Sequence, residues 1–127
     1  MIDVFPGMQA EILRSIFDSG IRGALLKTFG AGNAPTSSDF LEAVKYGTVA
    51  RGLPICNVTQ CNEGAVEQGR YAAGDELRKL VVIGGADMTP EAALVKMQFL
   101  LGLGCDSETL VTMMQSNLRG ELTQGHN

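Results

Sequence analysis

The chain has 127 residues, of which 45% are hydrophobic and 19% charged, a composition typical of one folded domain with its own core. Its formal net charge is −4 and its ten lysines and arginines are scattered, which argues against nucleic acid as a partner. No apolar run approaches the length of a membrane span and the first residues do not resemble a signal peptide, so we expect a cytoplasmic protein without membrane contact.

In chain order, a short strand is predicted at residues 2–5. A helix follows, because Met8, Ile12 and Ile16 recur at i, i+4 spacing and give it one apolar side. Gly20 suits the left-handed position at the end of that helix. The chain therefore begins with a strand and an amphipathic helix.

The same order repeats in the next segment. A buried strand is predicted at residues 22–30, and a helix at 36–52 that Thr36 or Ser37 can cap. The apolar run at 53–59 predicts a third strand, since a central strand of a parallel sheet is buried on both faces.

The second half begins less clearly, because residues 60–74 are too rich in glycine and polar side chains for an assignment. A short helix at 75–80 and a fourth strand at 81–85 follow. The helix predicted at 87–104 has a distinct start, where Thr89 can accept hydrogen bonds from the first free amides.

A last helix is predicted to begin at Asp106 or Ser107 and to run through Leu118. Strands that alternate with helices at this spacing predict a parallel sheet. The fold expected for residues 1–127 is therefore one α/β domain, a small Rossmann-like parallel sheet of about four strands with helices on both faces.

The glycine-rich turn "FGAGNAP" after the second strand invites comparison with a dinucleotide loop. Gly30 and Gly32 fit that fingerprint, but Pro35 stands at the third glycine position and the next strand ends without an acidic residue. Nucleotide binding is therefore disfavoured. Two interpretations stay open: the glycines only permit a tight turn, or they present Asn33 at the carboxyl edge of the sheet, where α/β proteins bind ligands.

A second polar cluster, Thr59, Gln60 and Cys61, ends the third strand and can hold a small zwitterion. It is not a catalytic set, because Cys61 as a nucleophile needs a base and the one histidine, His126, lies next to the end of the sequence. Asp87 as a general base lacks a visible partner. The three cysteines and the histidine show no metal-ligand spacing, so neither a metal nor a cofactor is predicted.

Six motifs occur in order along the chain: "FPGM", "FGAGNAP", "NVTQCNEGAV", "YAAGDEL", "GGADMTPEAALVKMQFLL" and "NLRGELT". Together they resemble the C-terminal domain of the bacterial type I (cytoplasmic) L-asparaginases, over essentially the whole chain. That family hydrolyses L-asparagine to L-aspartate and ammonia through an acyl-threonine intermediate, and its members are homo-oligomers, dimers or tetramers.

The resemblance implies that the chain is inactive alone. In the family the N-terminal domain carries the nucleophilic threonine in a "TGGTI"-like turn and a second threonine in a "TDT"-like motif, and neither motif occurs here. We therefore expect a domain without catalytic residues, separated from its catalytic partner domain. The rival hypotheses are a free-standing module that senses a small amino acid and a self-associating domain without a ligand.

The resemblance also implies two roles for the polar residues predicted at the carboxyl edge of the sheet. Asn33 matches the asparagine that helps to position the substrate or the catalytic groups in the active site of the neighbouring subunit. Thr59, Gln60 and Cys61 match residues that line an allosteric asparagine site in some members. Lys27 stands where a relative has arginine, and lysine lacks the planar fork that grips a carboxylate, which puts effector binding in question.

Overall fold

Four strands form one sheet in the computed structural model, which describes residues 1–29, 34–35, 37–60, 76–77 and 79–123. The strands lie side by side in sequence order, and each neighbouring pair is parallel. They are β1 (Ile2–Asp3), β2 (Ala24–Thr28), β3 (Ile55–Thr59) and β4 (Ile83–Gly84). The predicted parallel sheet is confirmed, with β3 as a central strand.

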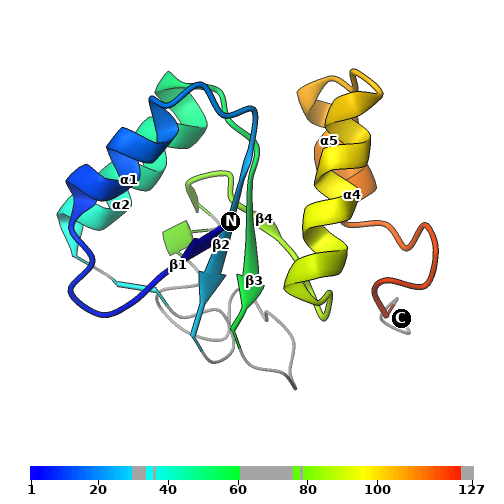
Figure 1. Cartoon of the computed structure of the whole chain (residues 1–127), viewed down its shortest axis with the longest axis horizontal. Helices are drawn as coiled ribbons and strands as arrows, with labels where there is room; N and C mark the ends of the chain where they lie inside the picture. Colours follow the sequence, from blue (N-terminus) through cyan, green and yellow to red (C-terminus); the bar gives the residue numbers. More distant parts are fainter. Residues whose placement is uncertain (30–33, 36, 61–75, 78, 124–127) are drawn as a thin grey trace.

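Helices cover both faces of the sheet, as predicted (Figure 1). On one face lie α1 (Ala10–Phe17) and α2 (Ser38–Lys45), and on the other α4 (Pro90–Gly102) and α5 (Ser107–Met114). Because β1, β2 and β3 follow one another in the same direction, crossovers of one hand bring α1 and α2 to the same face. The helices after β4 then cover the opposite face.

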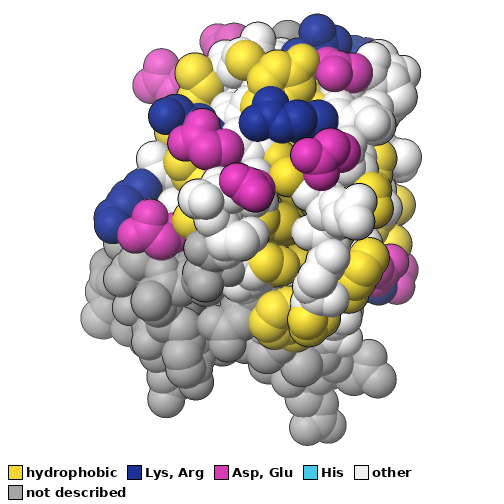
Figure 2. Space-filling view, turned by 90° about the vertical axis from the view of Figure 1, so that its left-hand side faces the viewer, with side chains coloured by type: hydrophobic (Ala, Val, Ile, Leu, Met, Phe, Trp, Pro, Cys, Tyr) yellow, Lys and Arg dark blue, Asp and Glu magenta, His cyan; other side chains and the backbone are white. Residues whose placement is uncertain are grey.

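Each face of the sheet has its own core, because successive strand residues point to opposite sides. On β2, Ala24 and Leu26 pack with α1 and α2, whereas Leu25 packs with α4 and α5. All five residues of β3 are buried. Figure 2 shows the face formed by α1 and α2, where charged side chains lie on the upper part and hydrophobic side chains gather among and below them.

The helix starts follow the predicted capping chemistry. The side chains of Ser37, Thr89 and Asp106 accept hydrogen bonds from backbone N–H groups three residues further on. Gly20 has a φ of +83°, the left-handed conformation expected after α1. Thr36, the alternative cap of α2, lies outside the described residues.

One predicted helix changes its geometry before its end, and another ends earlier than predicted. The helix at 36–52 passes at Tyr46 into a π-helical turn, η1 (Tyr46–Ala50), in which Gly47 packs so closely that an added Cβ would lie 2.8 Å from the Phe17 ring. The last helix ends at Met114, so Leu118 lies beyond it. The carbonyl groups of residues 114 and 116 accept hydrogen bonds from Lys96 instead of from a continuing helix.

Among the residues that the structure describes, no helix combines the length and the apolar character needed to cross a membrane.

Candidate functional site

The carboxyl ends of the four strands form the lower edge of the sheet in Figure 1. Three of the predicted site residues, Lys27, Thr59 and Gln60, lie at or next to this edge. Asn33 and Cys61 lie outside the described residues, so their predicted roles remain predictions.

Three buried polar side chains lie in the last residues of β2 and β3, next to the carboxyl edge. Thr28 and Asn57 are fully buried, and the hydroxyl of Thr28 donates a hydrogen bond of 2.6 Å to Oδ1 of Asn57. Thr59, which is 3% exposed, stands opposite Thr28 in the strand register. The pair of Thr28 and Asn57 was not predicted, although polar residues inside the buried runs "ALLKT" and "ICNVT" were a usable signal.

Gln60 joins three strand ends through hydrogen bonds. Its backbone N–H donates to the Thr28 carbonyl at 2.7 Å, and its side-chain Nε2 donates to the carbonyls of Lys27 at 2.6 Å and Val4 at 2.7 Å. On the other side, the Gly85 N–H donates to the Asn57 carbonyl at 2.8 Å. The amide nitrogen of Gln60 thus binds strand carbonyls, which leaves its oxygen as the group that can accept from a ligand.

Lys27 and Thr59 point to opposite faces of the sheet. Lys27 stands opposite Val58 in the register and Thr28 opposite Thr59, and side chains alternate along each strand. The Lys27 ammonium forms an ion pair of 2.6 Å with Asp3 on the neighbouring strand β1. The structure therefore brings Lys27 together with Gln60, but not with the hydroxyl of Thr59.

A hollow of about 310 Å³ opens between the N-terminal ends of α1 and α2 at this edge. Its lining includes Gln9, Glu11 and Asp39, and also Pro35 and Ser37, which follow the glycine-rich turn in the chain. Helix N-termini favour anionic groups, and the two carboxylates favour a cation. This combination suits a small zwitterion such as an amino acid.

Two side chains that could act as nucleophile or general base in amide hydrolysis, Cys56 and Asp87, are not activated for that role. Burial raises the pKa of the Cys56 thiol to about 12, so it stays protonated. Hydrogen bonds from Thr123 lower the pKa of Asp87, whose Oδ1 accepts from the Thr123 N–H at 2.8 Å. Asp87 therefore holds the C-terminal segment, and no group of three or more potential metal ligands gathers within the described ranges.

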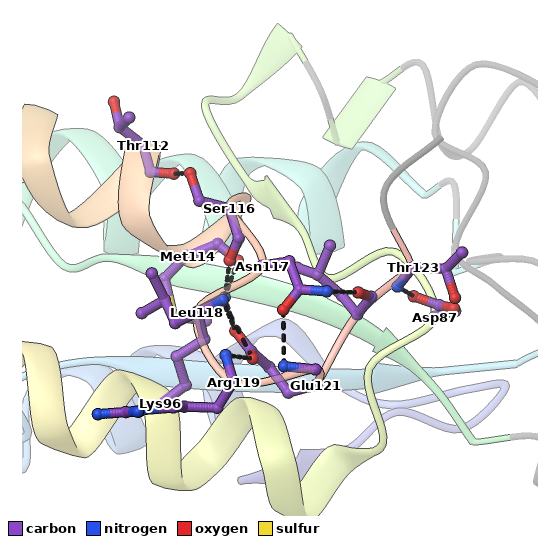
Figure 3. A network of polar contacts seen from close by, with 12 residues as sticks. Asp87, Lys96, Thr112, Met114, Ser116, Asn117, Leu118, Arg119, Glu121 and Thr123 are labelled. Atoms are coloured by element: carbon purple, nitrogen blue, oxygen red, sulfur yellow. Dashed lines mark hydrogen bonds and ion pairs between the residues drawn. The ribbon is translucent and has the colours of Figure 1, made fainter. Parts of the chain in front are cut away.

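A second polar network, which the sequence analysis missed, fastens the segment after α5 to α4 (Figure 3). Lys96 is 6% exposed, and its Nζ lies 2.5 Å from Oε1 of Glu121 and 3.0 Å from the Met114 carbonyl. The Glu121 carboxylate also accepts from the N–H groups of Leu118 and Arg119. A lone lysine within the apolar helix sequence "EAALVKMQFLL" was the signal for this network.

We expect Thr28→Val to lower the free energy of unfolding by about 1–3 kcal/mol, because Asn57 loses a hydrogen-bond donor in a buried site. Urea denaturation measures the change. Thr28→Ser, which keeps the hydroxyl, should lose less, and Thr112→Val on the exposed side of α5 should change little. Equal losses for the valine and serine variants at position 28 would contradict a role of the hydroxyl.

The chain is similar in sequence to a part of several known proteins. Residues 1–114 match the family model described as the glutaminase/asparaginase C-terminal domain. The chain is 41% identical to L-asparaginase 1 of Escherichia coli, over 97% of this chain and 36% of that protein. It is 39% identical to the human 60 kDa lysophospholipase, over 97% of this chain and 21% of that protein.

The fold agrees with the sequence match. The crystal structure of L-asparaginase I from Vibrio cholerae superimposes with a TM-score of 0.90 and 41% identity, covering 97% of this chain and 37% of that one. The chain thus spans little more than a third of the bacterial relatives that it matches.

Proposed function

The chain belongs to the glutaminase/asparaginase C-terminal domain family, and on this basis we propose that it is the C-terminal domain of a cytoplasmic, homo-oligomeric L-asparaginase. The proposed reaction of the whole enzyme is hydrolysis of L-asparagine to L-aspartate and ammonia. The observation that carries the proposal is the match to L-asparaginase I along 97% of the chain, in sequence and in fold together.

In this proposal the chain supplies no catalytic group, and the nucleophilic threonine belongs to the part of the enzyme that precedes this domain. Asn33 is presented by its turn to the active site of a neighbouring subunit, where its amide positions the substrate or the catalytic side chains. Gln60 and the buried pair of Thr28 and Asn57 support this role, because they tie together the strand ends from which the loops of the edge leave.

A domain exchange tests the proposal. The C-terminal domain of the Escherichia coli enzyme is replaced by this chain, and ammonia release from L-asparagine is measured. We expect the chimera to be active and the isolated chain to release no ammonia. An inactive chimera that is folded, or an isolated chain with an enzyme-like rate, would contradict the proposal.

Within the chimera, Asn33→Ala should lower kcat by about tenfold to a hundredfold, because a displaced substrate or catalytic group reacts more slowly. The melting temperature should change little, since the effect is one of positioning. Gln115→Ala, an exposed amide at the end of α5, is the matched control and should leave the rate unchanged. An unchanged rate in Asn33→Ala would remove this residue from the site.

The second candidate function is an asparagine sensor, either as the allosteric site of the enzyme or as a free-standing module. The hollow between the N-terminal ends of α1 and α2 favours binding of a zwitterion, but its lining includes none of Lys27, Thr59 and Gln60, so it is separate from the predicted effector set. Calorimetry of L-asparagine with the isolated chain is the test. Binding that weakens in Lys27→Ala and Thr59→Val would support the predicted effector set of Lys27, Thr59, Gln60 and Cys61, and an absence of binding would contradict the sensor.

A further inference from the structure

The outer side of α4 exposes an apolar stripe that nothing in the proposed amidase chemistry uses. Val95, Phe99 and Leu103 recur every four residues and are 63%, 58% and 64% exposed. Residues at this spacing lie on one side of a helix. We call this stripe, together with Leu118 and Arg119 beside it, the α4 face.

The α4 face has both a protrusion and a hollow. A groove of about 580 Å³ runs between α4 and the segment after α5, lined on one side by Ala92, Val95 and Phe99 and on the other by Leu118 and Arg119. Two-fold symmetric interfaces use the same patch on both copies, so a patch with an exposed aromatic ring next to an apolar groove can fit itself. A phenylalanine ring buried at the centre of an interface is a typical anchor.

Charges at the two ends of the α4 face are arranged in the same self-complementary way. Arg119 lies beside the N-terminal half of α4 and forms no ion pair with the residues that the structure describes. Asp106 and Glu108 are exposed at the start of α5, next to the C-terminal end of α4. Two further charged residues follow this pattern: Glu91 lies at the first end, and Arg22, which donates to the Leu101 carbonyl, lies at the second.

We propose that a second copy of this chain packs on the α4 face, with its α4 antiparallel to the first. A two-fold axis across the helix at Phe99 places each Phe99 against the other and each Val95 opposite Leu103. It also brings Arg119 of one copy opposite the acidic start of α5 of the other. Burial of the apolar side chains then stabilises the dimer, and the charges favour the antiparallel orientation of the two α4 helices. The proposal rests on the homo-oligomer suggested above and assigns a surface to it.

Sedimentation velocity over a dilution series of the chain tests the proposal. We expect a dimer whose dissociation constant rises about tenfold or more in Phe99→Glu, since buried aromatic anchors carry much of the energy of an interface. Val49→Glu, at an equally exposed valine on η1 of the opposite face, is the control and should leave the dimer intact. Circular dichroism on each variant shows that the fold is kept.

A charge exchange tests the direction of packing. Arg119→Glu alone should weaken the dimer, and the double variant Arg119→Glu with Glu108→Arg should restore it.

A dimer that is insensitive to Phe99→Glu would overturn the assignment of the interface to the α4 face, but not the proposal that the protein is an oligomer. A chain that stays monomeric at every concentration would overturn the proposed α4 interface, and ammonia release by the chimera decides the asparaginase assignment separately. A Phe99→Cys thiol alkylated in a monomeric chain but protected in the chimera would assign the face to the catalytic part instead.

Discussion

Replacement of Lys96 by methionine should lower the free energy of unfolding by about 3–5 kcal/mol, because it leaves the Glu121 carboxylate without its buried partner. The carbonyl groups of Met114 and Ser116 lose a donor in the same step. The segment after α5, whose Leu122 is buried among α4 and α5 residues, would lose its attachment. Chemical denaturation monitored by circular dichroism measures the change.

The control is the double variant Lys96→Met with Glu121→Leu. Replacing both members of a buried ion pair by apolar side chains costs less than removing one, since no uncompensated charge remains. Lys79→Met, in the exposed pair of Lys79 and Glu76, should change stability by about 1 kcal/mol or less. A double variant that is as unstable as the single one would mean that the lysine acts through packing.

The protein should lose on the order of 1–3 kcal/mol of stability through Glu121 as the pH falls from neutral to about 2, since solvent partly screens this carboxylate. The Lys96 hydrogen bond, with further ones from the backbone of Leu118 and Arg119, lowers the pKa of Glu121 from 4.5 to about 2. A carboxyl group whose pKa is lower in the folded than in the unfolded protein stabilises the fold fully above the unfolded value. This contribution is therefore present above pH 4.5 and disappears between 4.5 and about 2.

Denaturation of the wild-type chain and of Glu121→Gln at a series of pH values isolates this effect, because the other carboxyl groups are common to both. The stability difference should be largest above pH 4.5 and vanish near pH 2. Lys96→Met should remove most of the same acid dependence, because Lys96 is the main cause of the shift. Parallel stability curves for wild type and Glu121→Gln would contradict the lowered pKa.

The candidate site was only partly predictable. The position of Thr59 and Gln60 at the carboxyl edge follows from the sequence pattern, because parallel strands end at the same edge of a sheet, whereas Lys27 is implied only by the family resemblance. The division of Lys27 and Thr59 between two faces follows from the register of β2 and β3, which a single sequence does not specify. The side-chain amide of Gln60 donates hydrogen bonds to the carbonyls of Val4 and Lys27. These bonds were not predicted, because they depend on how three strands are placed relative to one another.

The family, the alternation of strands with helices and the helix start at Thr89 could be predicted from the sequence, and two further helix starts could be narrowed to Thr36 or Ser37 and to Asp106 or Ser107. These features depend on residues within a few positions of one another, where capping and apolar periodicity act, or on motifs in fixed order. Where α2 and α5 end, and which buried polar groups pair, depends on the tertiary structure. The Phe17 ring lies against Gly47 and Lys96 binds Glu121, and such contacts join residues far apart in sequence that become neighbours only when the helices pack on the sheet.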